Sequence, residues 1–340
     1  MLLAIPILLI LFDGGGAYWA PSDGGPVTPV LEAPIRTSSA TDGERVLIAW
    51  NASDGVRFGL FEQGAIAPMT GALLDDTFDE LRSPIALWNG SRYLVFWTSD
   101  AMTRAAVITP QGEVAQRVEL AEVPSVDDAA ANGDTIALIR QFGSDTHSGN
   151  VEVILLDADF AIVRRTVVGS ILKSTGGGTT FIARATIVPF GSGYYAAWQQ
   201  SRTSRYEDVV GTRITADGTA LDVVPSTREP RSLMGTILET NFPGSGTEIY
   251  ELELVVHRAR VLAIMKRTWG LRVTATAVDA NGAIEGPVQI GGKHMMPANA
   301  EVIARTDGSL ALAWFDADRI AEVQPFLRLD SAPRRRSARH

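Results

Sequence analysis

One short pattern recurs along this chain: a tight-turn dipeptide followed by an apolar run that ends on a large residue. The clearest copy is the segment 89–97 (NGSRYLVFW). Three further copies end on tryptophan and two weaker ones do not, and their last residues are Trp50, Trp198, Trp314, Arg140 and Met265. A single such unit cannot bury its own apolar face, so the recurrence indicates one supersecondary unit copied around an axis. The repeat therefore predicts that all 340 residues belong to one repeat domain.

Each unit also carries a second turn before another apolar strand. Between the two turns there is room for two short strands and a loop, and the flanking intervals supply two more strands. Four antiparallel strands repeated every roughly 40 to 50 residues are typical of a β-propeller blade, whose radial arrangement leaves only short sheet edges. We therefore expect an all-β protein that forms a single β-propeller with six four-stranded blades.

The expected blades follow one another along the chain, at about residues 35–75, 83–121, 125–170, 181–225, 249–291 and 297–330. The last of these units has no fourth strand. The segment 26–33 (PVTPVLEA) stands before the first blade, directly after an Asp-Gly-Gly turn, where a fourth strand stands in the other units. We predict that it pairs with residues 320–329 and closes the ring, which would satisfy two open strand edges.

The two ends of the chain differ from the repeats. Residues 2–12 are apolar and are followed by small residues, so 1–17 is expected to be a secretory signal cleaved after Ala17, although no basic residue precedes the run. The alternative is an apolar leader from a misplaced start, or a loosely packed arm. Residues 18–25 are predicted to be a linker and 331–340 a basic disordered tail. A cleaved signal would place the protein outside the cell, in the periplasm or on the cell surface.

Charge and composition exclude several partners. The net charge is -9, from 39 acidic and 30 basic residues, so neither nucleic acid nor anionic lipid is expected as a partner. No segment after the leader is long enough for an integral membrane span. The chain has no cysteine, and its four histidines (147, 257, 294 and 340) lack ligand spacing, so no metal site and no cofactor are predicted. We expect a monomer.

The segment 83–97 (SPIALWNGSRYLVFW) resembles the repeat of bacterial exported β-propeller proteins. In those repeats an Asn-Gly turn is followed by a strand similar to Tyr-Leu-Val-Val-Trp. The resemblance covers residues 26–330 in pattern and is clear in four units. It implies a propeller fold and an exported or surface location, but it implies no particular chemistry.

The repeated tryptophans are expected to be structural. Trp50, Trp97, Trp198 and Trp314 recur at one place in each unit, which is typical of a large residue that packs between neighbouring blades. Trp269 breaks the pattern, because it follows Lys266 in a loop, and both are candidates for ligand contact.

Long loops in the third to fifth units indicate where a site would lie. The segments 141–150, 169–180, 199–207 and 225–248 would crowd one face of the ring. They carry a polar and basic set from which we select His147, Arg202, Arg205 and Tyr206. The guanidinium group of arginine can donate two parallel hydrogen bonds to a carboxylate or sulfate group. An acidic glycan is therefore the most specific ligand hypothesis.

These observations favour a binding module whose ligand, a glycan or a protein, lies on the long-loop face. No catalytic residue is assigned, because the chain contains no complete catalytic motif. One alternative is a glycan hydrolase or lyase with carboxylates at the channel mouth, for which Glu207, Asp208 and Asp145 are the loop acids to test. The other alternative is a structural scaffold for protein interactions.

Overall fold

The computed structural model describes fourteen stretches of the chain, namely residues 7–12, 16–21, 28–31, 36–79, 82–143, 148–172, 185–203, 206–224, 229–232, 249–267, 272–289, 300–304, 310–316 and 319–325. Every regular element in these stretches is a β-strand. They contain no helix long and apolar enough to cross a membrane.

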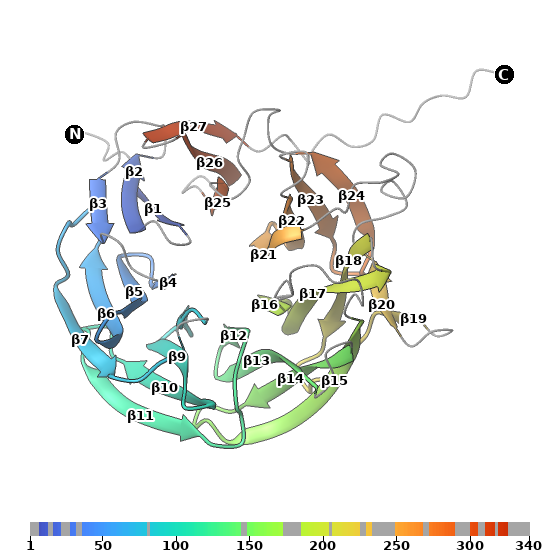
Figure 1. Ribbon diagram of the computed structural model, residues 1–340, viewed down its shortest axis with the longest axis horizontal. Coiled ribbons are helices and arrows are strands. Elements are labelled where there is room, and N and C mark those ends of the chain that lie inside the picture. The colour runs from blue at the N-terminus through green and yellow to red at the C-terminus, as the bar shows by residue number, and fades with distance from the viewer. Residues whose placement is uncertain are drawn as a thin grey trace.

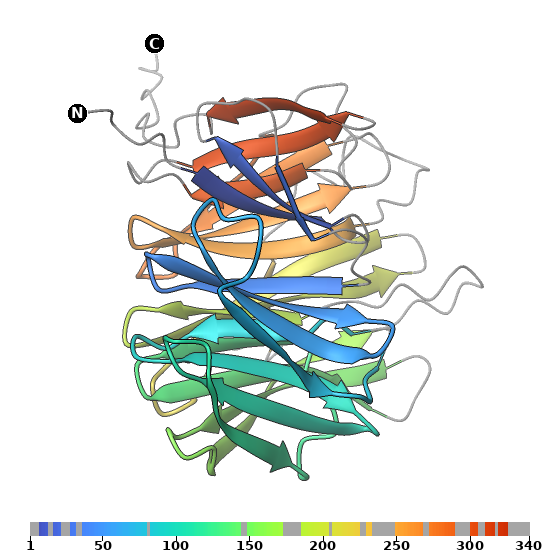
Figure 2. The same cartoon turned by 90° about the vertical axis from the view of Figure 1, so that its left-hand side faces the viewer.

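The strands form seven sheets within the described stretches, arranged around a central opening (Figure 1). We call β1–β3 the N-terminal sheet. The six sheets that follow are blade 1 (β4–β7), blade 2 (β8–β11), blade 3 (β12–β15), blade 4 (β16–β20), blade 5 (β21–β24) and blade 6 (β25–β27). The first strands of successive sheets lie beside one another, so they form the wall of the opening. Seen edge-on, the strands run along the axis of the ring (Figure 2).

Two sheets lie next to each other at the chain ends, and each has three described strands. The N-terminal sheet contains β1 (Ile7–Phe12), β2 (Gly16–Pro21) and β3 (Thr28–Leu31). Blade 6 contains β25 (Ala300–Ala304), β26 (Leu310–Asp316) and β27 (Arg319–Pro325). β1 lies beside both β25 and β4, so the N-terminal sheet stands between blade 6 and blade 1.

Blades 1 to 3 each have four antiparallel strands in simple order. Their strands are β4 (Arg36–Thr41), β5 (Arg45–Ala52), β6 (Gly55–Glu62), β7 (Thr70–Asp75), β8 (Ile85–Trp88), β9 (Tyr93–Ser99), β10 (Met102–Ile108), β11 (Val114–Leu120), β12 (Asp128–Asn132), β13 (Thr135–Phe142), β14 (Ser148–Leu156) and β15 (Ile162–Leu172).

Blade 4 differs from its neighbours because two short strands share its outer edge, where β20 pairs with both β18 and β19. Blade 5 again has four strands. The strands of these two blades are β16 (Ala185–Phe190), β17 (Gly193–Thr203), β18 (Tyr206–Ile214), β19 (Val223–Val224), β20 (Glu229–Ser232), β21 (Ile249–His257), β22 (Arg260–Arg267), β23 (Arg272–Val278) and β24 (Ile284–Gln289).

The recurring turn dipeptide has a direct local explanation. Asn89 Oδ1 accepts hydrogen bonds from the backbone N–H groups of Ser91 and Arg92, at 3.1 and 3.0 Å. Gly90, which lies between Asn89 and Ser91, has a φ of 97°, a backbone conformation that residues with a side chain disfavour. Asx side chains that cap their own turn in this way favour a tight reversal between two strands. The sequence Asn-Gly therefore joins the first two strands of blade 2.

The hydrophobic core is divided among the spaces between adjacent sheets. One cluster joins blades 3 and 4 and includes Ile139, Leu155 and Trp198. Similar clusters join blades 1 and 2, blades 2 and 3, and blades 4 and 5, while Trp19 joins the N-terminal sheet to blade 1. An inner strand between two such clusters, for example β9, is buried along its whole length and carries a nearly continuous apolar run, whereas the outer strand β11 is mostly exposed.

The expectation of an all-β propeller-like repeat is confirmed, but the count of six blades and the ring closure are not. The structure has seven sheets in its described part. β3, which lies within the segment 26–33, pairs with β2, and β27 pairs with β26. The difference arises because the apolar run of the expected leader forms β1, which gives β2 and β3 a partner within their own sheet. The signal, the linker and the tail stay predictions.

Candidate functional site

One register position recurs on the first strand of each blade. In the second strand of each blade, we call the large residue that ends the repeated apolar run the tryptophan position. The residue just before it pairs with one residue of the first strand. We call that first-strand residue the ring position. Its occupants in blades 1 to 6 are Ser38, Ile85, Asp128, Thr186, Glu253 and Glu301. Three of the six are acidic. Because the first strands line the central opening, the register brings these residues to one level of the channel wall.

Two ring-position side chains connect their blade to the next one. Ser38 Oγ accepts a hydrogen bond from the backbone N–H of Ala86, at 3.0 Å. Asp128 Oδ2 accepts one from the backbone N–H of Ile187, also at 3.0 Å. Both contacts run from the first strand of one blade to the first strand of its neighbour. A neutral hydroxyl is therefore sufficient for this structural contact, and the charge of Asp128 is additional.

A cavity of about 360 Å³ lies against the ring position of blades 3 to 5. Its walls come from β8, β12, β16 and β21, the first strands of four successive blades. Asp128, Thr186 and Glu253 supply its oxygen atoms, while Trp88, Val188 and Leu254 supply apolar surface. A cavity with apolar walls and a few convergent polar groups is the usual form of a small-ligand site. We call it the channel pocket.

Asp128 is held firmly as an acceptor in the channel pocket. Its Oδ2 also accepts a hydrogen bond from the Thr186 hydroxyl, at 2.6 Å, and its Oδ1 accepts one from the backbone N–H of Ala129, at 2.8 Å. Burial raises the pKa of Asp128 to about 6, although these three hydrogen bonds act to lower it. The nearby charge of Asp127 also acts to raise it. The carboxylate is thus ionised at neutral pH but remains sensitive to weak acid.

Glu253 contributes the second described carboxylate of the channel pocket. Its side chain is 28% exposed, and its Oε2 lies 4.0 Å from the Nζ of Lys266, which is fully buried. Lys266 stands on β22, behind the channel wall formed by β21. An ammonium group in that place partly neutralises Glu253 and orients it.

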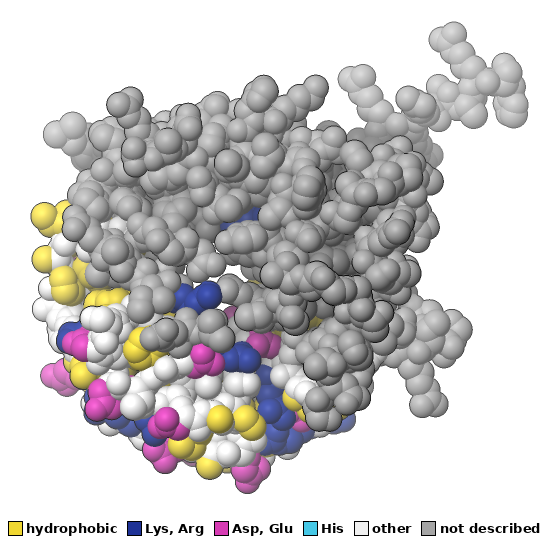
Figure 3. Space-filling view, in the orientation of Figure 1, with side chains coloured by type: hydrophobic (Ala, Val, Ile, Leu, Met, Phe, Trp, Pro, Cys, Tyr) yellow, Lys and Arg dark blue, Asp and Glu magenta, His cyan; other side chains and the backbone are white. Residues whose placement is uncertain are grey.

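A network of hydrogen bonds and ion pairs joins three blades near Asp128. Arg82 Nη1 donates to Asp127 Oδ1 at 2.7 Å, and the Arg82 carbonyl accepts a hydrogen bond from Asn51 Nδ2 at 2.9 Å. Asp127 Oδ2 in turn accepts the backbone N–H of Gln141, at 2.7 Å. Figure 3 shows basic and acidic side chains side by side near the centre of the ring. This network fixes the start of β12 and therefore the position of Asp128.

Most of the predicted ligand-binding residues fall where the structure gives no side chain. His147, Arg205 and Trp269 lie outside the described residues; Trp314, which is predicted to be structural, also has no described side chain. Arg202 and Tyr206 are described only as members of β17 and β18. The binding role of the long-loop face therefore stays a prediction. Lys266 is the one member of this set with a described side chain, and it is buried.

The described tryptophans of the repeat lie in the packing between sheets. Trp198 is fully buried between blades 3 and 4, and Trp97 is 3% exposed between blades 1 and 2. Trp97 Nε1 donates to Asp75 Oδ2 at 2.8 Å. Trp50 packs against the cluster that joins blade 1 to the N-terminal sheet.

Sequence reasoning missed the channel pocket because the ring position holds a different residue type in each blade. The available signal was a constant distance along the chain from the ring position to the tryptophan position in blades 1 to 5. In the described part of the chain, no three His, Asp or Glu residues come together in a group that could hold a metal ion.

Comparison with solved structures identifies the architecture. Hydrazine synthase from Kuenenia stuttgartiensis aligns with a TM-score of 0.54 and 13% identity, over 94% of this chain and 97% of that one. The WD40 domain of Toxoplasma gondii coronin aligns with a TM-score of 0.52 and 12% identity, over 94% and 78%. WD40 domains are β-propellers. The present chain has a propeller fold.

A third structure, the six-bladed fucose-recognising lectin of Aleuria aurantia, aligns over 85% of this chain and 95% of that one. Its TM-score is 0.49 and its identity 11%. No family model matches the sequence, and no curated protein matches it. At these identities the similarity concerns the fold alone, so function has to be argued from the site.

Proposed function

We propose that this propeller is a binding module that holds a neutral or amino-bearing glycan in the channel pocket. The observation that carries the proposal is the alignment of Asp128, Thr186 and Glu253 at the ring position of adjacent blades. Carboxylates accept strong, charge-assisted hydrogen bonds from hydroxyl and ammonium groups. Trp88 supplies an aromatic surface in the same cavity, against which the apolar face of a sugar can pack.

The chemistry of the channel pocket favours a ligand that donates hydrogen bonds. Ser38 makes the same contact between blades as Asp128 without a charge, so the carboxylate is available for recognition. An acidic glycan would meet like charge at Asp128 and Glu253, which disfavours it at this level of the channel. The acidic-glycan hypothesis belongs to the predicted long-loop face, and the same experiment can separate the two sites.

The experiment is binding of the purified full chain to a panel of neutral, amino-bearing and acidic oligosaccharides. We expect binding to neutral or amino-bearing members. Asp128→Ser keeps the contact between blades and removes the charge, so it should weaken binding about tenfold, as should Glu253→Gln. Glu113→Gln is the matched control, because Glu113 is exposed and distant from the channel pocket. Binding that all three substitutions leave unchanged would contradict the proposal.

A glycan hydrolase or lyase that uses the channel carboxylates is the second candidate. The raised pKa of Asp128, about 6, is in the range of a general acid. Three protein donors to its two oxygens favour an acceptor role instead. Release of new sugar ends from any oligosaccharide that binds, abolished in Asp128→Ser, would favour catalysis. An absence of binding across the panel would favour the protein-interaction scaffold.

A further inference from the structure

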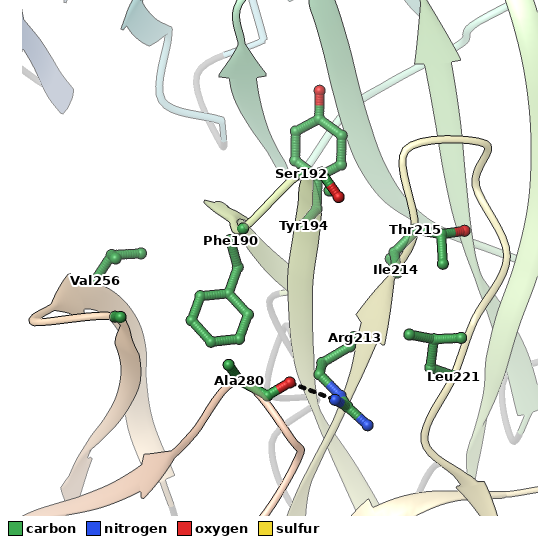
Figure 4. Close-up of a pocket in the computed structure, with 12 residues that line it drawn as sticks. Phe190, Ser192, Tyr194, Arg213, Ile214, Thr215, Leu221, Val256 and Ala280 are labelled. Atoms are coloured by element: carbon green, nitrogen blue, oxygen red, sulfur yellow. Dashed lines mark hydrogen bonds between the residues drawn. The ribbon is translucent and has the colours of Figure 1, made fainter.

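A second cavity, of about 290 Å³, lies between blades 4 and 5 (Figure 4). It shares no lining residue with the channel pocket. It is built from the turn between β16 and β17, the end of β18, the end of β21 and the turn after β23. These turns lie at the opposite end of the strands from the long loops predicted for glycan binding. We call it the turn pocket.

The walls of the turn pocket are apolar and open to water. Leu221 is 51% exposed and Val256 is 43% exposed, although both are large aliphatic residues. Figure 4 shows Val256 and Phe190 on one side of the cavity, with Leu221 and Ile214 on the other. The Phe190 ring packs edge-on against Tyr195, with ring centroids 6.3 Å apart and an interplanar angle of 88°. The aromatic wall is therefore fixed in place.

Between these walls stands a guanidinium group that is held rigidly. Arg213 Nε and Nη2 donate to the two carboxylate oxygens of Asp222, at 2.8 and 2.7 Å. Its Nη1 donates to the carbonyl of Ala280, at 2.5 Å. Gly282 permits this approach, because a Cβ at that position would lie 2.8 Å from Arg213 Nη2. The group is thus anchored on two sides before any ligand arrives.

Arg213 retains capacity to donate to a ligand. A guanidinium has five N–H groups, and three of them make the contacts just described. Asp222 compensates its charge, so the group suits a neutral acceptor better than an anion. The volume of the cavity is at the small end of the range for ligand sites. A compact ligand with one acceptor fits these properties.

We propose that the turn pocket binds a small, neutral aromatic molecule that carries a carbonyl oxygen. The ring lies between Phe190 and Leu221, where apolar contact on both faces removes it from water. The carbonyl accepts a hydrogen bond from an unused N–H of Arg213. Because no residue is shared with the channel pocket, this site is independent of the glycan proposal.

The test uses acetylnaphthalene as the probe and naphthalene as its partner without a carbonyl. Binding of each to the full chain is measured by ligand-observed NMR at probe concentrations up to about 1 mM. We expect acetylnaphthalene to bind about tenfold more tightly than naphthalene, because only the former offers an acceptor to Arg213. Equal affinity of the two compounds would overturn the role of Arg213.

Two substitutions test the location of the probe. Leu221→Asp and Val256→Asp place a charge on opposite walls, and both residues are exposed enough for the fold to tolerate the change. Each should weaken acetylnaphthalene binding at least tenfold. Val163→Asp is the matched control, because Val163 is 64% exposed on β15, away from the cavity. Equal loss in all three variants, or no binding by the wild-type protein, would overturn the proposal. Binding of a tryptophan-containing peptide in place of acetylnaphthalene would overturn it in favour of a protein partner.

Discussion

Ser38 and Asp128 occupy the same register position in blades 1 and 3, and each accepts a backbone hydrogen bond of 3.0 Å from the next blade. The two residues thus serve one structural purpose with different chemistry. Ser38 is neutral at every pH of interest, whereas Asp128 titrates. Stability and ligand binding can therefore be separated at Asp128 by exchanging one residue type for the other.

The stability of the protein should depend on the protonation of Asp128. Burial raises its pKa from 3.8 to about 6, so the folded chain binds this proton more tightly than the unfolded chain does. The resulting stabilisation is complete below pH 3.8 and is lost as the pH rises through about 6. Between about pH 3 and pH 7, wild type should lose about 3 kcal/mol relative to Asp128→Asn. Urea unfolding of both proteins across this range tests it, and parallel pH profiles would contradict it.

Trp19 should be a major contributor to the stability of the ring. It is 3% exposed, packs against Ile48 and Phe61 of blade 1, and its Nε1 donates to the carbonyl of Ala65 at 2.6 Å. Trp19→Ala should lower the free energy of unfolding by about 3 to 5 kcal/mol. Trp19→Phe keeps an aromatic ring and loses the hydrogen bond, so its effect should be about 1 kcal/mol. Unchanged melting temperatures in both variants would mean that the N-terminal sheet does not contribute to the folded ring.

Asp75 should be needed to connect blades 1 and 2. It lies on blade 1 and accepts hydrogen bonds from Trp97 Nε1, at 2.8 Å, and Arg104 Nη1, at 2.5 Å, both on blade 2. Burial acts to raise the pKa of Asp75, but these hydrogen bonds hold it below the usual value. Asp75→Ala removes the acceptor of Trp97 and leaves Arg104 only its longer contacts, such as Thr77 Oγ1 at 3.4 Å, so it should cost about 3 kcal/mol in chemical denaturation. Asp54→Ala removes a solvent-exposed ion pair with Arg57 and should change nothing measurable.

The hydrogen bonds of Asp75 also predict how stability depends on pH. Lowering the pH should remove the stabilisation from Asp75, whereas it adds to the stabilisation from Asp128. Because the pKa of Asp75 is lowered in the folded state, its stabilisation is present above pH 3.8 and is lost as the pH falls through the lower, folded value. The Asp75→Ala variant should therefore be less acid-sensitive than wild type. An equal loss of stability below pH 4 in both proteins would show that this group is not responsible.

Gly169 should resist substitution because of its neighbour in blade 4. A Cβ at Gly169 would lie 2.1 Å from Cζ2 of Trp198, which is fully buried. Gly169→Ala should lower the free energy of unfolding by about 2 kcal/mol through overpacking. Adding Trp198→Phe shortens the ring system and should restore part of that loss, which a double-mutant cycle measures. Simple additivity of the two effects would show that the contact is not the cause.

Local chemistry allowed the blades to be predicted where turn and strand signals agreed. In blade 2 the sequence Asn-Gly, its capping hydrogen bonds and the buried strand Tyr93–Ser99 all indicate the same hairpin. Blade 3 lacks the tryptophan, and Arg140 takes its place by pairing with Glu152 at 2.8 Å and stacking over Phe142. A polar pair of this kind replaces apolar packing without leaving a hydrophobic signal.

The number of sheets could not be predicted because one pattern has two explanations. An apolar run of about ten residues is typical of a signal sequence and also of a strand buried on both faces. Residues 7–12 form a strand, β1, paired along its whole length with β2. Periodicity alone does not separate the two, since the deciding partner, β2, comes later in the chain.

The channel pocket was unpredictable for a different reason. Asp128, Thr186 and Glu253 are far apart in sequence and have different chemistry, and only the pairing register places them at one level. The same register puts Lys266 behind Glu253, whereas the sequence analysis placed it in a loop as a candidate for ligand contact. Register depends on the pairing of whole strands, which a local motif does not encode.

Each sheet in the described part of this ring is built from one continuous stretch of chain, and none combines strands from the two ends. β1 lies beside β25, but no ladder of hydrogen bonds joins the two sheets. In the described part of the ring, no strand pairing therefore holds the two ends of the chain together. If the two ends are pulled apart, the ring should part first between β1 and β25, because no strand pairing joins these two neighbours. The remaining blades would then peel away one after another, each giving a separate step in extension.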